Sequence, residues 1–528
     1  MEINSIIPVV FIGFELEFSQ YPTKAKILEV IKYLNDRISG RWNIQRIFDD
    51  EYMYEVVGDI GMQVAPGMAF NITRELKNIQ EIEYANPIFD YEDVSAFNED
   101  DTELDTKSES SISDNYEWHL DQVRAKKAWE IPPVPPTGRV KGAGVIIAHL
   151  DTGYTDHYEL VEDGDVDVSK GYNFYENVAS PIEPLNTMKM GHGTATGSVL
   201  ISRPGRSPTN PNLSYVSGVA PEAKLVPIRV DKNVWFLSAR KDIRGIKHAI
   251  NIGAHVISMS RGGLSSRSFK KAIEKANKRG IIVIAAAGNC NLGCKVRAPA
   301  EFTNVVCVGG TTINDKPWKK TSRGPEVNVC APANRVWRAR TQNKNNTYFY
   351  DVGKSSGTSY ATPIVAGAAA LWIAFNGGHE ALSQKLGGVE RIPEAFMNQL
   401  AINGTWIPKD GWNQNKYGEG ILDTDKLLRS NLPIKEFNEH SEVVKNSELI
   451  AFFGAILEPQ TSHTEKLMEE IYDELMFNLR TNFELIKLYQ EFIDKAIDEK
   501  ELTVRAKQSL ILGDISDLMK TIPGLVSE

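Results

Sequence analysis

The sequence has few cysteines and no surplus of basic residues. Four cysteines in 528 residues exclude a scaffold that depends on a disulfide framework. The 59 Lys and Arg are outnumbered by 69 Asp and Glu, which gives a formal net charge of -10. Because no positive charge is left over to neutralise phosphates, the composition predicts no nucleic-acid partner.

Long apolar runs are also missing. No stretch reaches the roughly 18 apolar residues that a membrane-spanning helix needs, so the sequence predicts no membrane partner. The apolar run at residues 6–14 is too short, follows Glu2 rather than a basic residue, and leads into Glu15 and Glu17. With no small-residue cleavage site, that pattern is not typical of a signal peptide. We therefore expect a cytoplasmic protein, with an unusual export route as the alternative.

The four cysteines fall into two kinds. Cys290 and Cys294 are close enough in sequence either to form a disulfide or to remain free thiols. Cys307 and Cys330 lie in apolar runs, which predicts small buried residues. A zinc site at the first pair would lack a second pair of ligands nearby, so no metal ligands are predicted.

The first 95 residues have the pattern of a small α/β domain. Strand-like runs rich in Val, Ile and Phe alternate with segments whose apolar residues recur at helical spacing. The predicted strands cover residues 8–18, 44–57 with a turn at Asp49 and Asp50, and 82–91, and the predicted helices cover residues 24–38 and 68–79. The expected order is β-α-β-β-α-β.

Composition separates three further regions. Residues 96–114 are dominated by Asp, Glu and Ser, and a stretch so poor in apolar residues is expected to be an exposed linker that proteases can reach. Residues 115–430 are expected to form one large domain. In residues 431–528 glycine becomes scarce and apolar residues recur at helical spacing, which predicts a helical C-terminal extension. Binding a partner protein, dimerising and covering the large domain are its alternative roles.

The large domain alternates buried strands with helices. Strands are predicted at residues 145–150, 225–230, 256–260, 281–285 and 305–308, and helices at residues 243–252, 268–279 and 364–372. Continuous apolar strands separated by helices are typical of a parallel sheet that is covered on both faces. The sequence therefore predicts a three-layer α/β/α domain, with its site at the carboxyl ends of the strands.

Three short motifs contain the residue types of an acyl-transfer enzyme. Asp151 directly follows a predicted strand, His192 stands between two glycines in a run of small residues, and Ser359 precedes a buried helix. A serine hydroxyl needs a base to take its proton, and a buried aspartate usually holds the histidine base in the right tautomer. The motifs therefore predict a catalytic triad of Asp151, His192 and Ser359.

Asn289 is the fourth candidate. It closes the run Ala285 to Asn289 directly after a predicted buried strand. A side-chain amide at that edge can donate a hydrogen bond to the oxygen that becomes negatively charged during acyl transfer. Asn289 is therefore predicted to be an oxyanion-hole donor.

Together these motifs resemble the signatures of the subtilisin-like serine proteases. The family's signatures read Asp-Thr-Gly, His-Gly-Thr and Gly-Thr-Ser-x-Ala-x-Pro, and all three are intact here, in that order, at Asp151, His192 and Ser359. The family's oxyanion asparagine matches Asn289. The resemblance covers residues 115–430 and implies a subtilisin-like serine endopeptidase that requires no cofactor for its chemistry.

The resemblance also implies where a peptide or protein substrate binds. The residues expected to bind it are Ser260, Arg261, Gly262, Gly263, Ala286, Ala287 and Gly288. Arg261 stands where the family often has Leu, and Lys295 and Arg297 follow the oxyanion asparagine. One hypothesis is that these three cations favour acidic substrate side chains through charge complementarity. The alternative is that all three point to solvent.

The N-terminal domain is similar to the propeptide that precedes many subtilisin-like domains. This resemblance implies a ferredoxin-like fold that assists folding and occupies the protein's own cleft, here with residues 86–90, until it is cut. The acidic linker would then be the place of release. The alternative is a permanently attached binding domain.

Calcium is common in the family, so a structural calcium ion is the one metal that the resemblance suggests. The acidic run at residues 162–167 alternates carboxylates with a glycine, as some calcium loops do. It lacks the full spacing of a known calcium loop, and a solvated loop is the alternative. The ion therefore stays unplaced.

Three functions remain open from the sequence. The first is an endopeptidase made as a zymogen that processes itself. The second is a dedicated maturation protease for one specific partner. The third is a catalytically silent module that only binds peptides. The intact motifs favour an enzyme, because degenerate copies usually lose at least one of these residues.

Overall fold

The computed structural model describes most of the chain. The described residues are 8–59, 61–91, 115–161, 165–184, 191–204, 216–290, 294–344, 347–409, 411–433, 473–479, 481–493, 499–512 and 515–520. The predicted linker at residues 96–114 lies outside them.

The chain divides into two compact units, which we call the terminal unit and the central unit. The terminal unit contains residues 1–97 and 443–528 together with residues 236–238, and the central unit contains residues 98–235 and 239–442. The N-terminal domain and the C-terminal helices, which the sequence analysis treated as separate, therefore belong to one unit.

The N-terminal part of the terminal unit has the expected element order. Its elements are β1 (Val9–Phe18), α1 (Lys24–Asn35), β2 (Trp42–Arg46), β3 (Met53–Gly58), α2 (Pro66–Lys77) and β4 (Ile82–Tyr91). The strands form an antiparallel sheet in the order β2-β3-β1-β4. Helix α1 begins where the Thr23 side chain accepts a hydrogen bond from the N–H of Lys26, and α2 begins at Pro66, which needs no donor there.

Residues 86–90 lie within this sheet, and their occupation of the cleft stays a prediction. They form part of β4 and pair with β1 from Glu15 to Val10. Ile88 and Phe89 are buried in the domain's own core.

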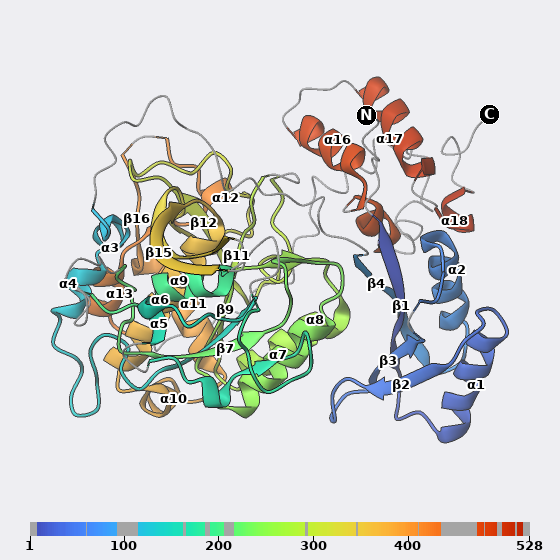
Figure 1. Ribbon diagram of the computed structural model, residues 1–528, viewed down its shortest axis with the longest axis horizontal. Helices are drawn as coiled ribbons and strands as arrows, with labels where there is room; N and C mark the ends of the chain where they lie inside the picture. The colour runs from blue at the N-terminus through green and yellow to red at the C-terminus, as the bar shows by residue number, and fades with distance from the viewer. Residues whose placement is uncertain are drawn as a thin grey trace. The chain divides into compact units, whose positions relative to one another are not determined.

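The described C-terminal residues are helical. They comprise residues 473–479, α16 (Phe483–Ile493), α17 (Glu499–Leu512) and α18 (Asp517–Lys520). Figure 1 shows α18 beside α2 of the N-terminal domain, with which it is in contact.

The rest of the chain builds the central unit around one large sheet. The strands between residues 115 and 433 are β5 (Ile146–Asp151), β6 (Tyr172–Asn173), β7 (Lys224–Arg229), β8 (Trp235–Phe236), β9 (Val256–Met259), β10 (Gly262–Gly263), β11 (Ile282–Ala286), β12 (Val306–Thr311), β13 (Val329–Pro332), β14 (Val336–Lys344), β15 (Thr347–Ser355), β16 (Thr405–Trp406) and β17 (Ile421–Leu422). The large sheet has the order β16-β17-β13-β12-β11-β9-β5-β7-β6. Its pairs are parallel except for β16 with β17.

Helices pack against this sheet. They are α3 (Trp118–Gln122), α4 (Ala125–Trp129), α5 (Tyr158–Val161), α6 (His192–Ile201), α7 (Arg240–Asn251), α8 (Arg267–Lys278), α9 (Thr358–Phe375), α10 (His379–Leu386), α11 (Arg391–Asn403), α12 (Gln414–Tyr417) and α13 (Thr424–Arg429). Helices α7 and α8 pack together over β5 and β11, and α6 packs with α9 over the sheet. The predicted α/β domain with a mainly parallel sheet is confirmed.

Helix α9 is more apolar than the sequence analysis anticipated. Among the described residues it is the one helix that is long and apolar enough to cross a membrane, but 89% of its window is buried inside the protein. Apolar residues on all sides are expected of a helix in the middle of a large domain. Its composition therefore reflects its place in the core.

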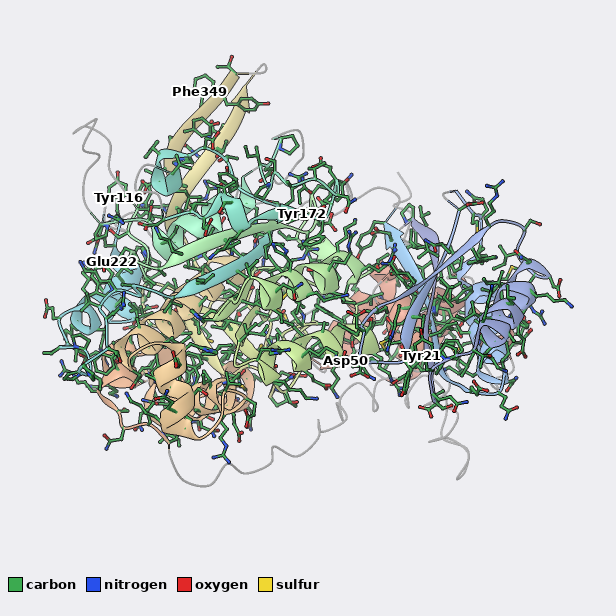
Figure 2. All side chains as sticks on the ribbon, turned by 90° about the horizontal axis from the view of Figure 1, so that it is seen from below. Tyr21, Asp50, Tyr116, Tyr172, Glu222 and Phe349 are labelled. Carbon is green, nitrogen blue, oxygen red and sulfur yellow. A yellow bond between two sulfur atoms is a disulfide. The ribbon has the colours of Figure 1, made fainter. Side chains whose placement is uncertain are left out.

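A β-hairpin that the sequence analysis did not predict precedes the nucleophile motif. Strands β14 and β15 pair antiparallel from Val336–Ser355 to Lys344–Thr347. Figure 2 shows the hairpin projecting from the central unit, with Phe349 near its far end. The side chains of Tyr348, Phe349 and Tyr350 are exposed.

Candidate active site

Adjacent strands bring the candidate residues to one edge of the sheet. Asp151 is the last residue of β5, Ser260 follows β9, and Asn289 follows β11. These three strands are neighbours in the order β11-β9-β5 and run parallel. Their carboxyl ends therefore meet at the edge where ligands bind in open α/β sheets.

Asp151 and His192 form a direct pair. Asp151 Oδ1 lies 2.7 Å from His192 Nδ1 and accepts a second hydrogen bond, 2.7 Å long, from the N–H of Thr152. Burial by itself would raise the pKa of Asp151, but His192, His149 and the Thr152 N–H together lower this pKa to about 2. Asp151 is therefore an anion at neutral pH. Because its Oδ1 accepts the hydrogen bond from Nδ1 of His192, the proton of the neutral imidazole lies on Nδ1.

Small residues allow His192 to reach Asp151. Gly191 precedes α6 with φ of 73°, a conformation that favours glycine. A Cβ atom on Gly193 would lie 2.0 Å from the carbonyl oxygen of Gly153. The start of α6 therefore lies directly against the turn after β5, where only glycine fits.

Ser359 is held at the start of α9 by Ser260. The Ser260 hydroxyl donates to the Ser359 carbonyl oxygen at 2.8 Å, and the Ser359 hydroxyl lies 3.4 Å from the Ser260 carbonyl oxygen. The backbone N–H groups of the first helical turn have no partner within the helix. The nucleophile candidate therefore stands beside donors that can face a developing negative charge.

Asn289 is oriented by the residue before Ser359. Its Oδ1 accepts hydrogen bonds of 3.1 Å from both the N–H and the hydroxyl of Thr358, which fixes which end of the amide is the oxygen. A Cβ atom on Gly357 would lie 3.6 Å from Asn289 Nδ2 and 3.7 Å from the Ser359 N. The two nitrogen atoms therefore border the same point beside Gly357, and the role of Asn289 as an oxyanion-hole donor remains a prediction.

The predicted substrate-binding residues lie around this edge. The N–H of Gly262 donates to the Val234 carbonyl at 3.0 Å, and the N–H of Gly263 donates to the Ala298 carbonyl at 2.9 Å. Ala286 ends β11, and Ala287 and Gly288 connect it to Asn289. Their contacts with a substrate remain a prediction.

The side chain of Arg261 does not present a free cation to the substrate cleft, which the charge hypothesis requires. It is buried, and its guanidinium lies 2.8 Å from Asp242 and 3.5 Å from Asp231. Arg297 is also buried, with its guanidinium 4.5 Å from the ring centroid of Trp235. For these two residues the hypothesis of a free cation in the cleft and the alternative of a solvent-exposed side chain are both wrong.

The cysteines separate as the sequence suggested. Cys290 and Cys294 form a disulfide directly after the oxyanion-hole candidate, so they are not a zinc pair. Cys307 and Cys330 are buried free thiols. Burial raises the pKa of both thiols, which makes them unreactive structural residues.

Glu183 is a site residue that the sequence analysis missed. Its carboxylate is buried and accepts hydrogen bonds from the Thr152 hydroxyl at 2.9 Å and from the Gly191 N–H at 3.0 Å. Thr152 and Gly191 are the direct neighbours of Asp151 and His192. A lone glutamate between prolines in the sequence gave no signal of this role.

Two other histidines near the motifs are structural. His149 is buried in β5, where its Nε2 lies 2.9 Å from the Thr196 hydroxyl, as its place within a strand predicted. His157 Nε2 lies 2.8 Å from the carbonyl oxygen of Asp351. Burial lowers the pKa of both imidazoles, so both are neutral at pH 7.

The acidic run does not provide a calcium site in its described part. Residues 162–164 lie outside the described residues. Asp165 is paired with Arg203 at 2.6 Å and Lys224 at 3.1 Å. The described residues contain no group of three or more His, Cys, Asp or Glu that could hold a metal ion. Asp165 therefore uses its carboxylate on two cationic side chains, and a structural calcium ion stays an unplaced prediction.

Comparison with known proteins agrees with this site. Residues 142–404 match the Subtilase family. The chain is 30% identical over 332 residues to M-protease of Shouchella clausii (strain KSM-K16), covering 63% of this chain and 73% of that protein. It is 31% identical over 313 residues to subtilisin Savinase of Lederbergia lenta, covering 59% of this chain and 98% of that protein.

Solved structures with the same fold cover more of the chain. Fervidolysin from Fervidobacterium pennivorans, a keratinolytic enzyme related to subtilisin, aligns with a TM-score of 0.57 at 18% identity, over 82% of this chain and 63% of that one. The epidermin leader peptide processing serine protease of Staphylococcus aureus aligns with a TM-score of 0.52 at 18% identity, over 80% of this chain and 99% of that one. The signatures, the sheet edge and these relatives agree: the chain belongs to the subtilase family and is a subtilisin-like serine endopeptidase.

Proposed function

We propose that Asp151, His192 and Ser359 form the catalytic triad that cleaves peptide bonds. The observation that carries this proposal is the 2.7 Å contact between Asp151 and His192 at the same sheet edge as Ser359. Ser359 Oγ attacks the scissile carbonyl carbon while His192 Nε2 takes the hydroxyl proton. The buried anion of Asp151 stabilises the imidazolium that forms.

The remaining steps follow from the same groups. The negatively charged carbonyl oxygen of the tetrahedral intermediate sits between Asn289 Nδ2 and the Ser359 N–H, at the point beside Gly357. His192 then gives its proton to the leaving amine, and the C–N bond breaks to leave an acyl-enzyme on Ser359. A water molecule then gives a proton to His192 while its oxygen attacks the ester carbon. The C–O bond to Ser359 breaks, His192 returns the proton to Ser359 Oγ, and the acid product leaves.

The N-terminal domain is proposed to be a propeptide, so that the chain is a zymogen that processes itself. Its element order and its strand order, β2-β3-β1-β4, support a ferredoxin-like fold. Since residues 86–90 are part of β4, the cut is expected after Tyr91, in the acidic stretch. A permanently attached binding domain is the alternative.

Intact mass of the purified chain beside Ser359→Ala tests both parts of this proposal. The wild type is expected to lose about the first hundred residues, while the variant stays whole. Activity on an unstructured peptide is expected to fall about 10⁶-fold in the variant, the size known for subtilisin. Equal activity of the two proteins would overturn the triad, and an uncut but active wild type would overturn only the self-processing.

The proposal leaves the natural substrate and compartment as predictions. A dedicated maturation protease stays an alternative, since the likeness to the leader peptide processing protease is one of fold. Cytoplasmic location was expected from the N-terminus, but the Cys290–Cys294 disulfide is more usual in an oxidising compartment. Fractionation of the source cells, with free thiols blocked at lysis, measures the compartment of the protein and the oxidation state of Cys290 and Cys294.

A further inference from the structure

The N-terminal domain and the C-terminal helices meet through one face of α2. Phe70, Asn71 and Arg74 lie on this face, and Phe70 and Arg74 are about one helical turn apart. Phe477 packs against Phe70, with ring centroids 5.5 Å apart, and against Phe89 of β4 at 4.7 Å. All three rings are at least 95% buried. Aromatic side chains in such a setting are the residues that carry most of the energy of an interface.

A reciprocal pair of hydrogen bonds stands beside the rings. Asn71 Nδ2 donates to Asp517 Oδ2 at 2.9 Å, and the N–H of Asp517 donates to Asn71 Oδ1 at 3.0 Å. The two residues are 446 positions apart in the chain. The pair fixes the register of α18 along α2.

A buried carboxylate completes the contact. Glu474 is 1% exposed and lies 2.7 Å from Arg74 of the N-terminal domain. It also accepts hydrogen bonds of 2.6 Å from the N–H and the hydroxyl of Ser516. Separating the two parts would break this ion pair, so the pair opposes separation.

We propose that the C-terminal helices hold the N-terminal domain in place after the linker is cut. We call the contact formed by Phe70, Asn71 and Arg74 with Phe477, Glu474 and Asp517 the clamp. The covalent connection between the domain and the rest of the chain runs only through the linker, whereas the clamp is non-covalent and is made by the opposite end of the chain. The idea rests on the proposed processing, since it concerns what happens afterwards.

The test separates retention from self-processing by cutting the linker from outside. A recognition sequence for a site-specific protease is placed within residues 99–113 of the full chain carrying Ser359→Ala, which cannot cut itself. After digestion, size-exclusion chromatography at micromolar concentration with mass detection follows the N-terminal fragment. The fragment is expected to co-elute with the rest of the chain, and its release would overturn the proposal.

Substitutions in the clamp show whether this contact is what retains the fragment. Arg74→Ala, which leaves the C-terminal helices unchanged, and Phe477→Ala are each expected to weaken retention by about a hundredfold. Glu491→Ala is the matched control, because Glu491 pairs with Arg505 inside the C-terminal helices. Equal retention by all of these variants would overturn the proposal, because another surface would then hold the fragment.

Misfolding of a single variant is separated from loss of the contact by a double-mutant cycle. Arg74→Ala and Glu474→Ala are measured alone and together. If the two side chains act through each other, the double variant is expected to be little weaker than either single variant. Full additivity would contradict a contact between them.

A second inference concerns Glu183 and rests on the central unit alone. The N–H groups on both sides of His192 end on one network: Gly191 donates to Glu183, and Gly193 donates to the Thr152 hydroxyl at 3.1 Å, which itself donates to Glu183. We infer that Glu183 is a positioning residue, which fixes the start of α6 and with it the imidazole of His192 against Asp151.

The charge of Glu183 also affects the protonation of His192. Burial raises its pKa to about 7, although the Gly191 N–H, the Thr152 hydroxyl and Arg229 of β7 oppose this, while Asp151 of β5 adds to it. Glu183 therefore becomes charged near neutral pH. An anion there favours the protonated imidazole of His192, because opposite charges attract.

Glu183→Ala and Glu183→Gln test this role. The alanine variant is expected to lose about 10- to 100-fold in kcat with KM nearly unchanged, because a small displacement of a catalytic group is costly. The glutamine variant retains the bridge, since the Thr152 hydroxyl can turn to accept, and is expected to recover most of kcat. Its kcat/KM profile is expected to shift its acid limb to lower pH. An unchanged kcat in the alanine variant, or a glutamine variant as slow as the alanine variant, would overturn the assignment.

Discussion

Two arginine–carboxylate pairs, one in each unit, differ in how far apart their residues stand in the chain. Arg261 and Asp242 are 19 residues apart, within the central unit. Arg74 and Glu474 are 400 residues apart, at the two ends of the terminal unit. The near pair is a permanent part of one domain, whereas the remote pair joins segments that a single cut in the linker makes separate molecules. The same chemistry therefore stabilises a fold in one unit and an association in the other.

Removing the cation of the near pair is expected to have the largest effect on stability. Arg261→Met in the Ser359→Ala background leaves Asp242 buried without its cation, which costs about 3–5 kcal/mol of unfolding free energy. Urea denaturation followed by tryptophan fluorescence measures it. A loss below about 1 kcal/mol would mean that the pair does not stabilise the central unit.

Peptide-bond cleavage is expected to depend on Asn289, which belongs to neither arginine–carboxylate pair. Asn289→Ala removes a donor to the oxyanion and should lower kcat by roughly 10²–10³-fold. It also removes the acceptor of two buried hydrogen bonds from Thr358, so the central unit should lose about 1–3 kcal/mol of unfolding free energy. Asn289→Asp is the control: it retains an oxygen that accepts from Thr358 but has no N–H to donate, so it should be no more active. If the aspartate variant recovers activity, the residue acts through Thr358 and not on the substrate.

Removing the cation of the remote pair is expected to cost less. In Arg74→Met the buried Glu474 still accepts two hydrogen bonds from Ser516, which continue to stabilise its charge. We expect a loss of about 1–3 kcal/mol from the terminal unit and none from the central unit. Hydrogen exchange resolved by segment distinguishes a loss of stability in the terminal unit from one in the central unit. Increased exchange in β5 or β9 would contradict the expectation that the central unit is unaffected.

The smallest effect is expected on substrate charge. Because Arg261 uses its charge on Asp231 and Asp242, peptides that differ only by an acidic or a neutral side chain at the non-prime positions should differ less than about fivefold in kcat/KM. A preference of a hundredfold for acidic peptides would show that a cation does face the cleft.

The sequence predicted those parts of the molecule that depend on neighbours in the chain. The strands ending at Asp151 and Ala286 were recognisable as continuous apolar runs, and the motifs around His192 and Ser359 as short runs of small residues. The order of the N-terminal elements followed from periodicity in the same way. In each case the decisive neighbours lie within about ten residues.

What the sequence did not reveal depends on residues that are distant in the chain. The orientation of the Arg261 side chain is set by Asp242 and Asp231. Nothing in the sequence around Arg261 indicates these two partners. Glu183 owes its role to Thr152, 31 residues away. The contact of α2 with Phe477 joins segments separated by almost the whole chain. The hairpin of β14 and β15 was missed because no continuous apolar run marks it: β14 carries two Arg and other polar residues, and β15 begins with four exposed residues.

Helix α9 also has a consequence for how the chain is made. By length and composition alone, its apolar stretch meets the criteria for a membrane-spanning helix. The strands that cover it, β9, β11, β12 and β13, all precede it in the chain. During N-to-C synthesis its binding surface is therefore already translated when α9 emerges, and a rearranged chain order that placed α9 first would expose it to membrane insertion and aggregation.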